Sequence, residues 1–127
     1  MKNHFTPFIL IFLFFIINPL QIYAQQTKID IELLAEYNHA LKLFNSKAYV
    51  GAQKYFIEVS ENAKNEIGIK ADADYYDAIC AIRLHQADAD EKILKFVDNY
   101  PNSTKKYKAY FNVGNYYFAN KKAAHAL

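Results

Sequence analysis

The chain has 127 residues, 53% of them hydrophobic, which is enough for one small domain with a modest core. Its net charge of +2 is close to neutral, so it gives no general attraction to nucleic acid or anionic lipid, and we expect no nucleic-acid partner. Cys80 is the single cysteine, which excludes an internal disulfide and leaves packing to hold the fold.

The first residues have the order of a secretory signal peptide. Lys2 gives a basic start, the run Phe8–Ile17 is apolar without interruption, and Ala24 offers a small residue for cleavage. A transmembrane anchor is the alternative, but this run is shorter than the roughly 20 apolar residues that cross a bilayer. We therefore expect a cleaved signal peptide over 1–24 and a leader over 25–32, with no lipid anchor.

Beyond the leader, apolar residues recur at spacings of three and four, which predicts amphipathic helices. Asp88 and Glu91 resemble a capping box, and Pro101 is expected to end the helix that they begin. No window has a period of two, so the chain is predicted to be all-α. The predicted helices run over about 33–44, 52–63, 71–82, 89–100 and 105–118, and a sixth begins at Ala123 after a turn at Lys121-Lys122.

The helices repeat in pairs. Three segments superpose with Ala40, Ala78 and Gly114 in register, at spacings of 38 and 36, so the repeated unit is a helical hairpin. At this point the sequence resembles the tetratricopeptide repeat (TPR) family. The stretches FVDNYPNS and AYFNVGNYYF also resemble its envelope subset, which includes periplasmic TPR proteins and outer-membrane assembly lipoproteins of BamD type. The second unit matches least well, because no small residue aligns cleanly at Asp90.

The resemblance covers residues 33–127. It implies an α-solenoid of stacked antiparallel helix hairpins, a TPR-like superhelix of about two and a half repeats. The third repeat is incomplete, and we expect a C-terminal continuation; a dimer that covers the exposed stripe is the alternative. By family position, the residues that pack the repeats are Ala40, Phe44, Tyr49, Ala52, Phe56, Ala78, Ile82, Pro101, Tyr110, Gly114, Tyr117 and Ala126. The candidate peptide-binding residues, on the exposed side of the first helix of each repeat, are Asn38, Lys42, Asp74, Asp77, Arg83 and Asn112.

No pattern of catalytic or metal-ligating residues emerges. Asp72, Asp74 and Asp77 suggest a calcium loop, but the glycine and the glutamate that an EF-hand needs are missing, so we interpret them as the solvated start of a helix. The histidines are not spaced to share a metal. Cys80, inside an apolar helix, is interpreted as a small buried residue rather than a nucleophile. We expect no cofactor, no metal and no small-molecule substrate.

These features predict a non-catalytic protein-protein interaction scaffold of the bacterial cell envelope, periplasmic or associated with the outer membrane. Peptide or protein segments would bind on the concave face of the superhelix. One alternative is a component of outer-membrane protein assembly. Another is the N-terminal adaptor region of a larger signalling protein or enzyme, because a fold does not fix a function.

Overall fold

The computed structural model describes residues 31–125, which are helices joined by turns, without a strand in that range. This confirms the all-α prediction. A helix that we call the leading helix is described from residue 31 to 45, and it is followed by α2 (Tyr49–Asn62), α3 (Ile67–Arg83), α4 (Ala89–Asn99) and α5 (Lys106–His125). The predicted signal peptide, most of the leader, and the predicted packing residue Ala126 lie outside the described residues.

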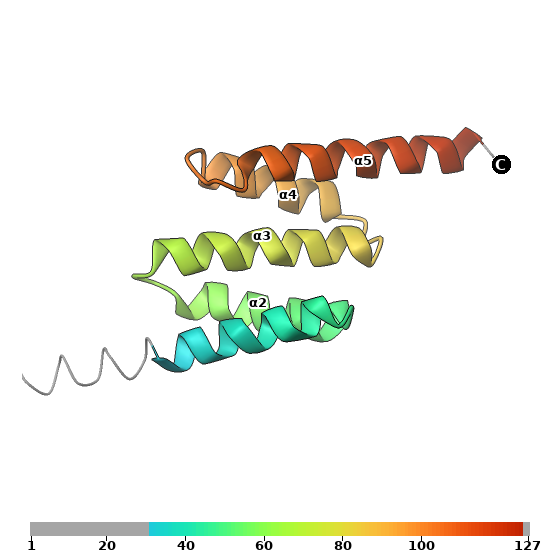
Figure 1. The fold of residues 1–127 in the computed structure, drawn as a ribbon. Helices are drawn as coiled ribbons and strands as arrows, with labels where there is room; N and C mark the ends of the chain where they lie inside the picture. The colour runs from blue at the N-terminus through green and yellow to red at the C-terminus, as the bar shows by residue number, and fades with distance from the viewer. Residues whose placement is uncertain (1–30, 126–127) are drawn as a thin grey trace, which may run out of the picture. The chain divides into compact units, whose positions relative to one another are not determined.

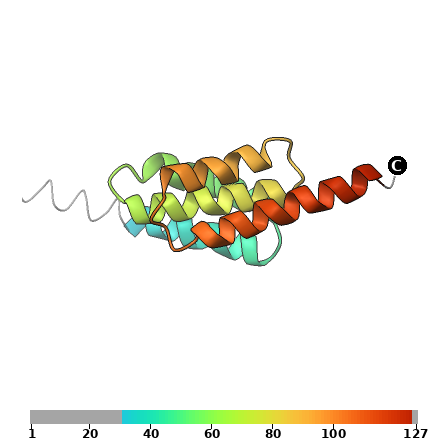
Figure 2. The same ribbon diagram turned by 90° about the horizontal axis from the view of Figure 1, so that it is seen from above.

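The residues from Leu33 onward form one compact unit, in which each helix runs antiparallel to the one before it. Figure 1 shows the leading helix, α3 and α5 stacked above one another, with α2 and α4 behind them. Seen from above in Figure 2, α4 and α5 lie on opposite sides of α3. The architecture is therefore repeat-like, with two pairs of helices followed by one long helix.

The core consists of two clusters that meet at α3. On one side, Ala73 and Cys80 of α3 pack with apolar residues of the leading helix and α2. On the other side, Ala71, Tyr75 and Ala78 pack with residues of α4 and α5. Because α3 has apolar residues on both of these faces, it is the central helix of the unit.

Small residues recur where neighbouring helices cross. Ala40 and Ala78 are fully buried on the leading helix and α3, and Ala52 and Ala89 are fully buried on α2 and α4. The first two are 38 residues apart and the second two are 37 apart, so the connection within the second pair is one residue shorter. An alanine at a crossing allows the backbones to approach closely, which a larger side chain would prevent.

The same hydrogen-bonded cap ends the leading helix and α3. Lys47 and His85 both have a left-handed backbone, with φ of 64° and 55°. Each amide donates to the carbonyl three residues earlier, at 2.9 and 3.2 Å, and the next amide donates to the carbonyl five residues earlier, at 2.9 and 3.0 Å. This is the Schellman arrangement, and its two occurrences are 38 residues apart. The second helices of the pairs also end alike, since the amides of Ala63 and Tyr100 each donate four residues back.

Several predicted helix ends differ from the structure. α3 begins at Ile67 rather than near residue 71, because Gly68 continues the helix. The predicted turn at Lys121-Lys122 is wrong: α5 continues to His125, since Lys and Ala are strong helix formers and no Gly or Pro interrupts them. The side chain of Asp88 makes no capping hydrogen bond, so the predicted capping box is absent.

The predicted packing residues before α5 lie in or beside the two core clusters, with the exception of Pro101. Phe44, Tyr49 and Ile82 are half-buried beside the two clusters, and Phe56 is fully buried. Pro101 is exposed in the turn before α5.

On α5, the residues expected to pack against another helix are exposed. Tyr110 and Tyr117 are 47% and 48% exposed, and a Cβ added to Gly114 would meet nothing within 4 Å. Tyr117 still contacts α4, because its hydroxyl donates to the carboxylate of Asp90 at 2.7 Å.

Replacing Ala78 by leucine tests the close crossing of α3 with its neighbours. Ala78→Leu should lower the free energy of unfolding by about 1–3 kcal/mol, because the extra methyl groups have no room in the cluster. Ala35→Leu, on the exposed side of the leading helix, should change it by no more than about 0.5 kcal/mol. Urea unfolding followed by circular dichroism measures both, and equal effects would contradict the close packing.

Candidate functional site

A groove that we call the front groove lies between the end of α3 and the middle of α5, with a volume of about 370 Å³. Antiparallel packing on α4 brings these two helices side by side, and the left-handed His85 turns the chain away at its edge. Its lining residues are Ile82, Arg83, His85, Phe111, Asn112, Asn115, Tyr116, Ala119 and Asn120.

The front groove offers hydrogen-bond donors, an acceptor and apolar surface together. Arg83 is exposed and, within the described residues, has no ion-pair partner. The amide nitrogen of Asn112 donates to the hydroxyl of Tyr75 at 3.3 Å and to the carbonyl of Lys108 at 2.8 Å, which fixes the side chain with its oxygen left to accept. Phe111 is 69% exposed at the same groove. A guanidinium, an amide oxygen and an aromatic ring can together bind the carboxylate, backbone and side chain of a peptide.

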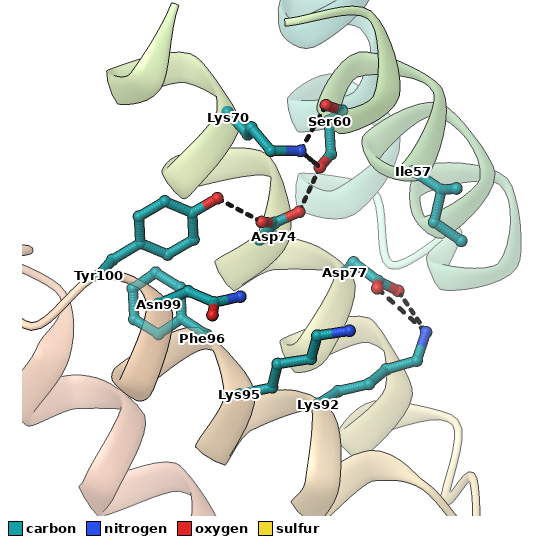
Figure 3. A pocket seen from close by; sticks show the side chains of 10 residues that line it. All are labelled: Ile57, Ser60, Lys70, Asp74, Asp77, Lys92, Lys95, Phe96, Asn99 and Tyr100. Carbon is teal, nitrogen blue, oxygen red and sulfur yellow. Dashed lines mark hydrogen bonds and ion pairs between the residues drawn. The ribbon is translucent and has the colours of Figure 1, made fainter. Parts of the chain in front are cut away.

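A second groove, which we call the polar groove, lies where α2, α3 and α4 meet and has a volume of about 510 Å³ (Figure 3). Its lining residues are Ile57, Ser60, Lys70, Asp74, Asp77, Lys92, Lys95, Phe96, Asn99 and Tyr100. Most of its polar groups bind one another, whereas Lys95 and Asn99 make no side-chain hydrogen bond to any described residue.

Asp74 occupies one half of the polar groove. It accepts hydrogen bonds from the hydroxyl of Ser60 and, at 2.6 Å, from that of Tyr100, while Lys70 donates to the Ser60 hydroxyl at 2.9 Å. Burial raises the pKa of Tyr100, and the hydrogen bond to Asp74 and its charge raise it further, so Tyr100 stays a donor. These contacts join α3 to α2 and to the end of α4.

Asp77 occupies the other half. Its carboxylate pairs with the ammonium of Lys92 at 2.9 Å and accepts from the amide of Gln53 at 2.8 Å. Gln53 is itself buried and exchanges two hydrogen bonds, of 2.9 and 2.8 Å, with Gln86 in the turn after α3. Asp77 therefore links α2, α3 and α4 and is engaged within the protein.

The structure corrects the expected grouping of the candidate peptide-binding residues. Asp74 and Asp77 were expected on one face with Arg83 and Asn112, but they lie in the polar groove, because their positions on α3 point them towards α2 and α4. Asn38 and Lys42 are exposed on the leading helix, and neither lines the front groove or the polar groove. The front groove thus brings together Arg83 and Asn112 from the predicted set.

Asp72 forms a third link, which joins α3 to the leading helix and to the turn before α5. The hydroxyl of Tyr37 on the leading helix donates to it at 3.2 Å, and Lys105, just before α5, pairs with it. The ammonium of Lys105 also lies 5.7 Å from the ring centre of Tyr76. Burial and the charge of Asp72 raise the pKa of Tyr37. The three aspartates are therefore inter-helix links, and the predicted solvated start of a helix is wrong for them.

Sequence reasoning missed several residues that shape these surfaces. Ala89, the small residue of α4, aligns with Ala52 of α2 when the second repeat is allowed to be one residue shorter between its two helices. The buried Gln53–Gln86 pair leaves no signal, because glutamine is usually exposed. Phe111 and Tyr116, which line the front groove, are found by extending the helical period along α5.

Three further features of the described part of the chain bear on its chemistry. No group of three or more His, Cys, Asp or Glu residues there could hold a metal ion. None of its helices combines the length and apolarity that a bilayer crossing requires. Cys80 is fully buried, and burial raises the pKa of its thiol to about 12, with the charge of Asp77 adding to the effect. The thiol is therefore protonated at neutral pH.

No protein-family model matches the chain, and no curated protein or solved structure is significantly similar to it.

The thiol of Cys80 predicts how stability depends on alkaline pH. In the unfolded chain it loses its proton near pH 8.5, whereas in the folded chain it keeps the proton until about pH 12. Between these values the folded state binds more protons, so the free energy of unfolding falls as pH rises, by at most about 1.4 kcal/mol per pH unit. Urea unfolding between about pH 8 and 10.5 should therefore show a steeper fall for the wild type than for Cys80→Ala. Equal slopes would contradict a protected thiol.

Proposed function

We propose that the chain is a TPR-like α-solenoid that acts as a non-catalytic scaffold for protein-protein interaction. Two matched structural features support a duplicated hairpin. The Schellman caps at Lys47 and His85 have the same hydrogen bonds, and the buried Ala52 and Ala89 occupy the same place on the second helix of each pair. In such arrays each hairpin packs on its neighbours and leaves an extended surface for partners.

The observation that carries the binding function is the chemistry of the front groove. Arg83 and Asn112 come from two stacked helices and face the same hollow, beside the exposed ring of Phe111. This arrangement favours an extended peptide, which presents backbone groups and side chains at regular intervals. Asp74 and Asp77 take no part in this proposal, because their carboxylates are bound by neighbouring helices.

A non-catalytic role is favoured by the state of the potential reactive groups. Cys80 is buried and protonated, so it has neither the access nor the charge of a nucleophile. Among the described residues, Asp72, Asp74 and Asp77 are engaged by tyrosines, lysines and Gln53, so each has a structural role.

A selection of unstructured peptides displayed on phage tests the front groove directly. Peptides that bind the full chain should lose affinity by at least about tenfold, or 1.4 kcal/mol, when Arg83→Ala and Asn112→Ala are combined. The matched control combines Lys95→Ala with Asn99→Ala in the polar groove and should leave the affinity within about twofold. Circular dichroism confirms that both double variants fold. Failure to select any binder, or equal losses in both variants, would overturn the groove assignment.

The proposal also places the scaffold in a bacterial cell envelope, which rests on the signal-like sequence over 1–24. When the full sequence is expressed in a bacterial host, the protein recovered from the periplasm should have the intact mass of residues 25–127. Replacing Ala24 by isoleucine should block cleavage, because the peptidase site requires a small residue. Recovery of the uncleaved chain from the cytoplasm would contradict export.

A further inference from the structure

The charges that line the polar groove do not cancel. Three lysines and two aspartates line it, so its formal net charge is +1. Asp77 pairs directly with Lys92 at 2.9 Å. The carboxylate of Asp74 is offset by Lys70 through a shared serine hydroxyl, which donates to the carboxylate and accepts from the ammonium. The positive charge that is left over belongs to Lys95, whose ammonium has no hydrogen bond or ion pair with the described residues.

A second uncommitted donor lies beside this ammonium. Asn99 also lines the polar groove, and its side chain makes no hydrogen bond to the described residues. Figure 3 shows both side chains along α4 on the side of the groove. Lys95 and Asn99 are four residues apart, so they share one face of the helix, and an ammonium and an amide can reach the same ligand group.

The carboxylates of the groove are not free to neutralise Lys95. Asp77 is held by the amide of Gln53 at 2.8 Å as well as by its lysine, and Asp74 is held by the hydroxyl of Tyr100 at 2.6 Å. A rotation of either carboxylate towards Lys95 would break these contacts. The surplus charge is therefore left for a ligand, which would meet walls that are already ordered.

The groove also indicates the charge and the size of its ligand. A single negative charge balances the net charge of the lining, whereas a doubly charged group would be repelled by the two nearby carboxylates. Two adjacent donors match the two oxygens of one carboxylate. Ile57 of α2, which is 38% exposed, and the methylene stem of Lys95 offer apolar surface in the same groove. Its volume of about 510 Å³ is typical of sites for small organic molecules.

We propose that the polar groove binds a small organic monocarboxylate. Its carboxylate accepts from Lys95 and Asn99, and its apolar part lies against Ile57. An extended peptide fits this groove less well, because most of the polar groups that could bind its backbone bind one another. The two grooves share no lining residue, so this site goes beyond the proposed scaffold function and either assignment can fail without the other.

The test titrates the isotope-labelled full chain with hexanoate at constant ionic strength and follows the amide signals by NMR. Saturable shifts should appear near the end of α4, with a dissociation constant between about 1 and 20 mM, as expected for a ligand of few atoms. Hexanamide has the same shape without the charge, and it should bind at least about fivefold more weakly. Sulfate should bind more weakly than hexanoate, because of its second charge and its lack of an apolar part.

Variants of Lys95 assign the site. Lys95→Met keeps the apolar stem and removes the charge, so it should weaken hexanoate binding by at least about fivefold, whereas Lys95→Arg should stay within about threefold of wild type. The matched control is Lys42→Met, an exposed lysine of the leading helix outside both grooves, which should change the affinity by less than about twofold. Circular dichroism checks that all three variants fold.

Four results would each refute the proposal. The first is a wild-type titration with hexanoate that does not saturate by about 50 mM. The second is equal affinity for hexanoate and hexanamide, and the third is tighter binding of sulfate than of hexanoate. The fourth is an equal loss of affinity in Lys95→Met and Lys42→Met, which would mean that the carboxylate responds only to the overall charge of the protein.

Discussion

The fold depends on the close packing of α3 on two sides at once. Ala73 and Cys80 face the leading helix and α2, whereas Ala71 and Ala78 face α4 and α5, and these residues are small. Small side chains allow the neighbouring helices to approach until larger residues such as Phe56 can fill the space between them. With no internal disulfide available, this packing supplies most of the stability. It also positions the front groove and the polar groove.

Polar contacts then fix the orientation of the helices around α3. Asp74 and Asp77 share one face of α3, whereas Asp72 points to different neighbours, since residues three apart lie on the same side of a helix and residues two apart do not. The carboxylate of Asp72 binds Tyr37 of the leading helix and Lys105 just before α5. The carboxylates of Asp74 and Asp77 each bind a side chain of α2, and they also bind Tyr100 just after α4 and Lys92 of α4, respectively. Each of these carboxylates is half-buried and bound by more than one donor. If a shift of one helix removes a donor, the carboxylate keeps its charge but is poorly solvated. Such contacts therefore favour one relative placement of the helices over others.

The sequence is sufficient to predict the helices and the crossing residues Ala40 and Ala78, because both follow from the spacing of apolar and small residues. It fails at Ala89, where a one-residue shorter connection shifts the register, and at the start of α3, where Gly68 is helical. The face on which a polar residue lies was harder to predict. Asp77 and Arg83 are six residues apart on one helix, but one binds α4 and the other lines the front groove. That difference depends on where neighbouring helices pack, which is a property of tertiary structure.

α5 differs from the earlier helices in a way that bears on the front groove. Its buried side matches that of α3 at one position, since Ala109 is fully buried as Ala73 is. Its remaining sides carry exposed aromatic rings, the ring of Phe111 among them, in place of buried ones. In the described residues α5 thus presents a groove edge suited to an extended chain. Since α3 and α4 pack against α5, a ligand in the front groove would meet a pre-ordered surface. A scaffold with this feature can bind an extended segment with little loss of its own conformational entropy.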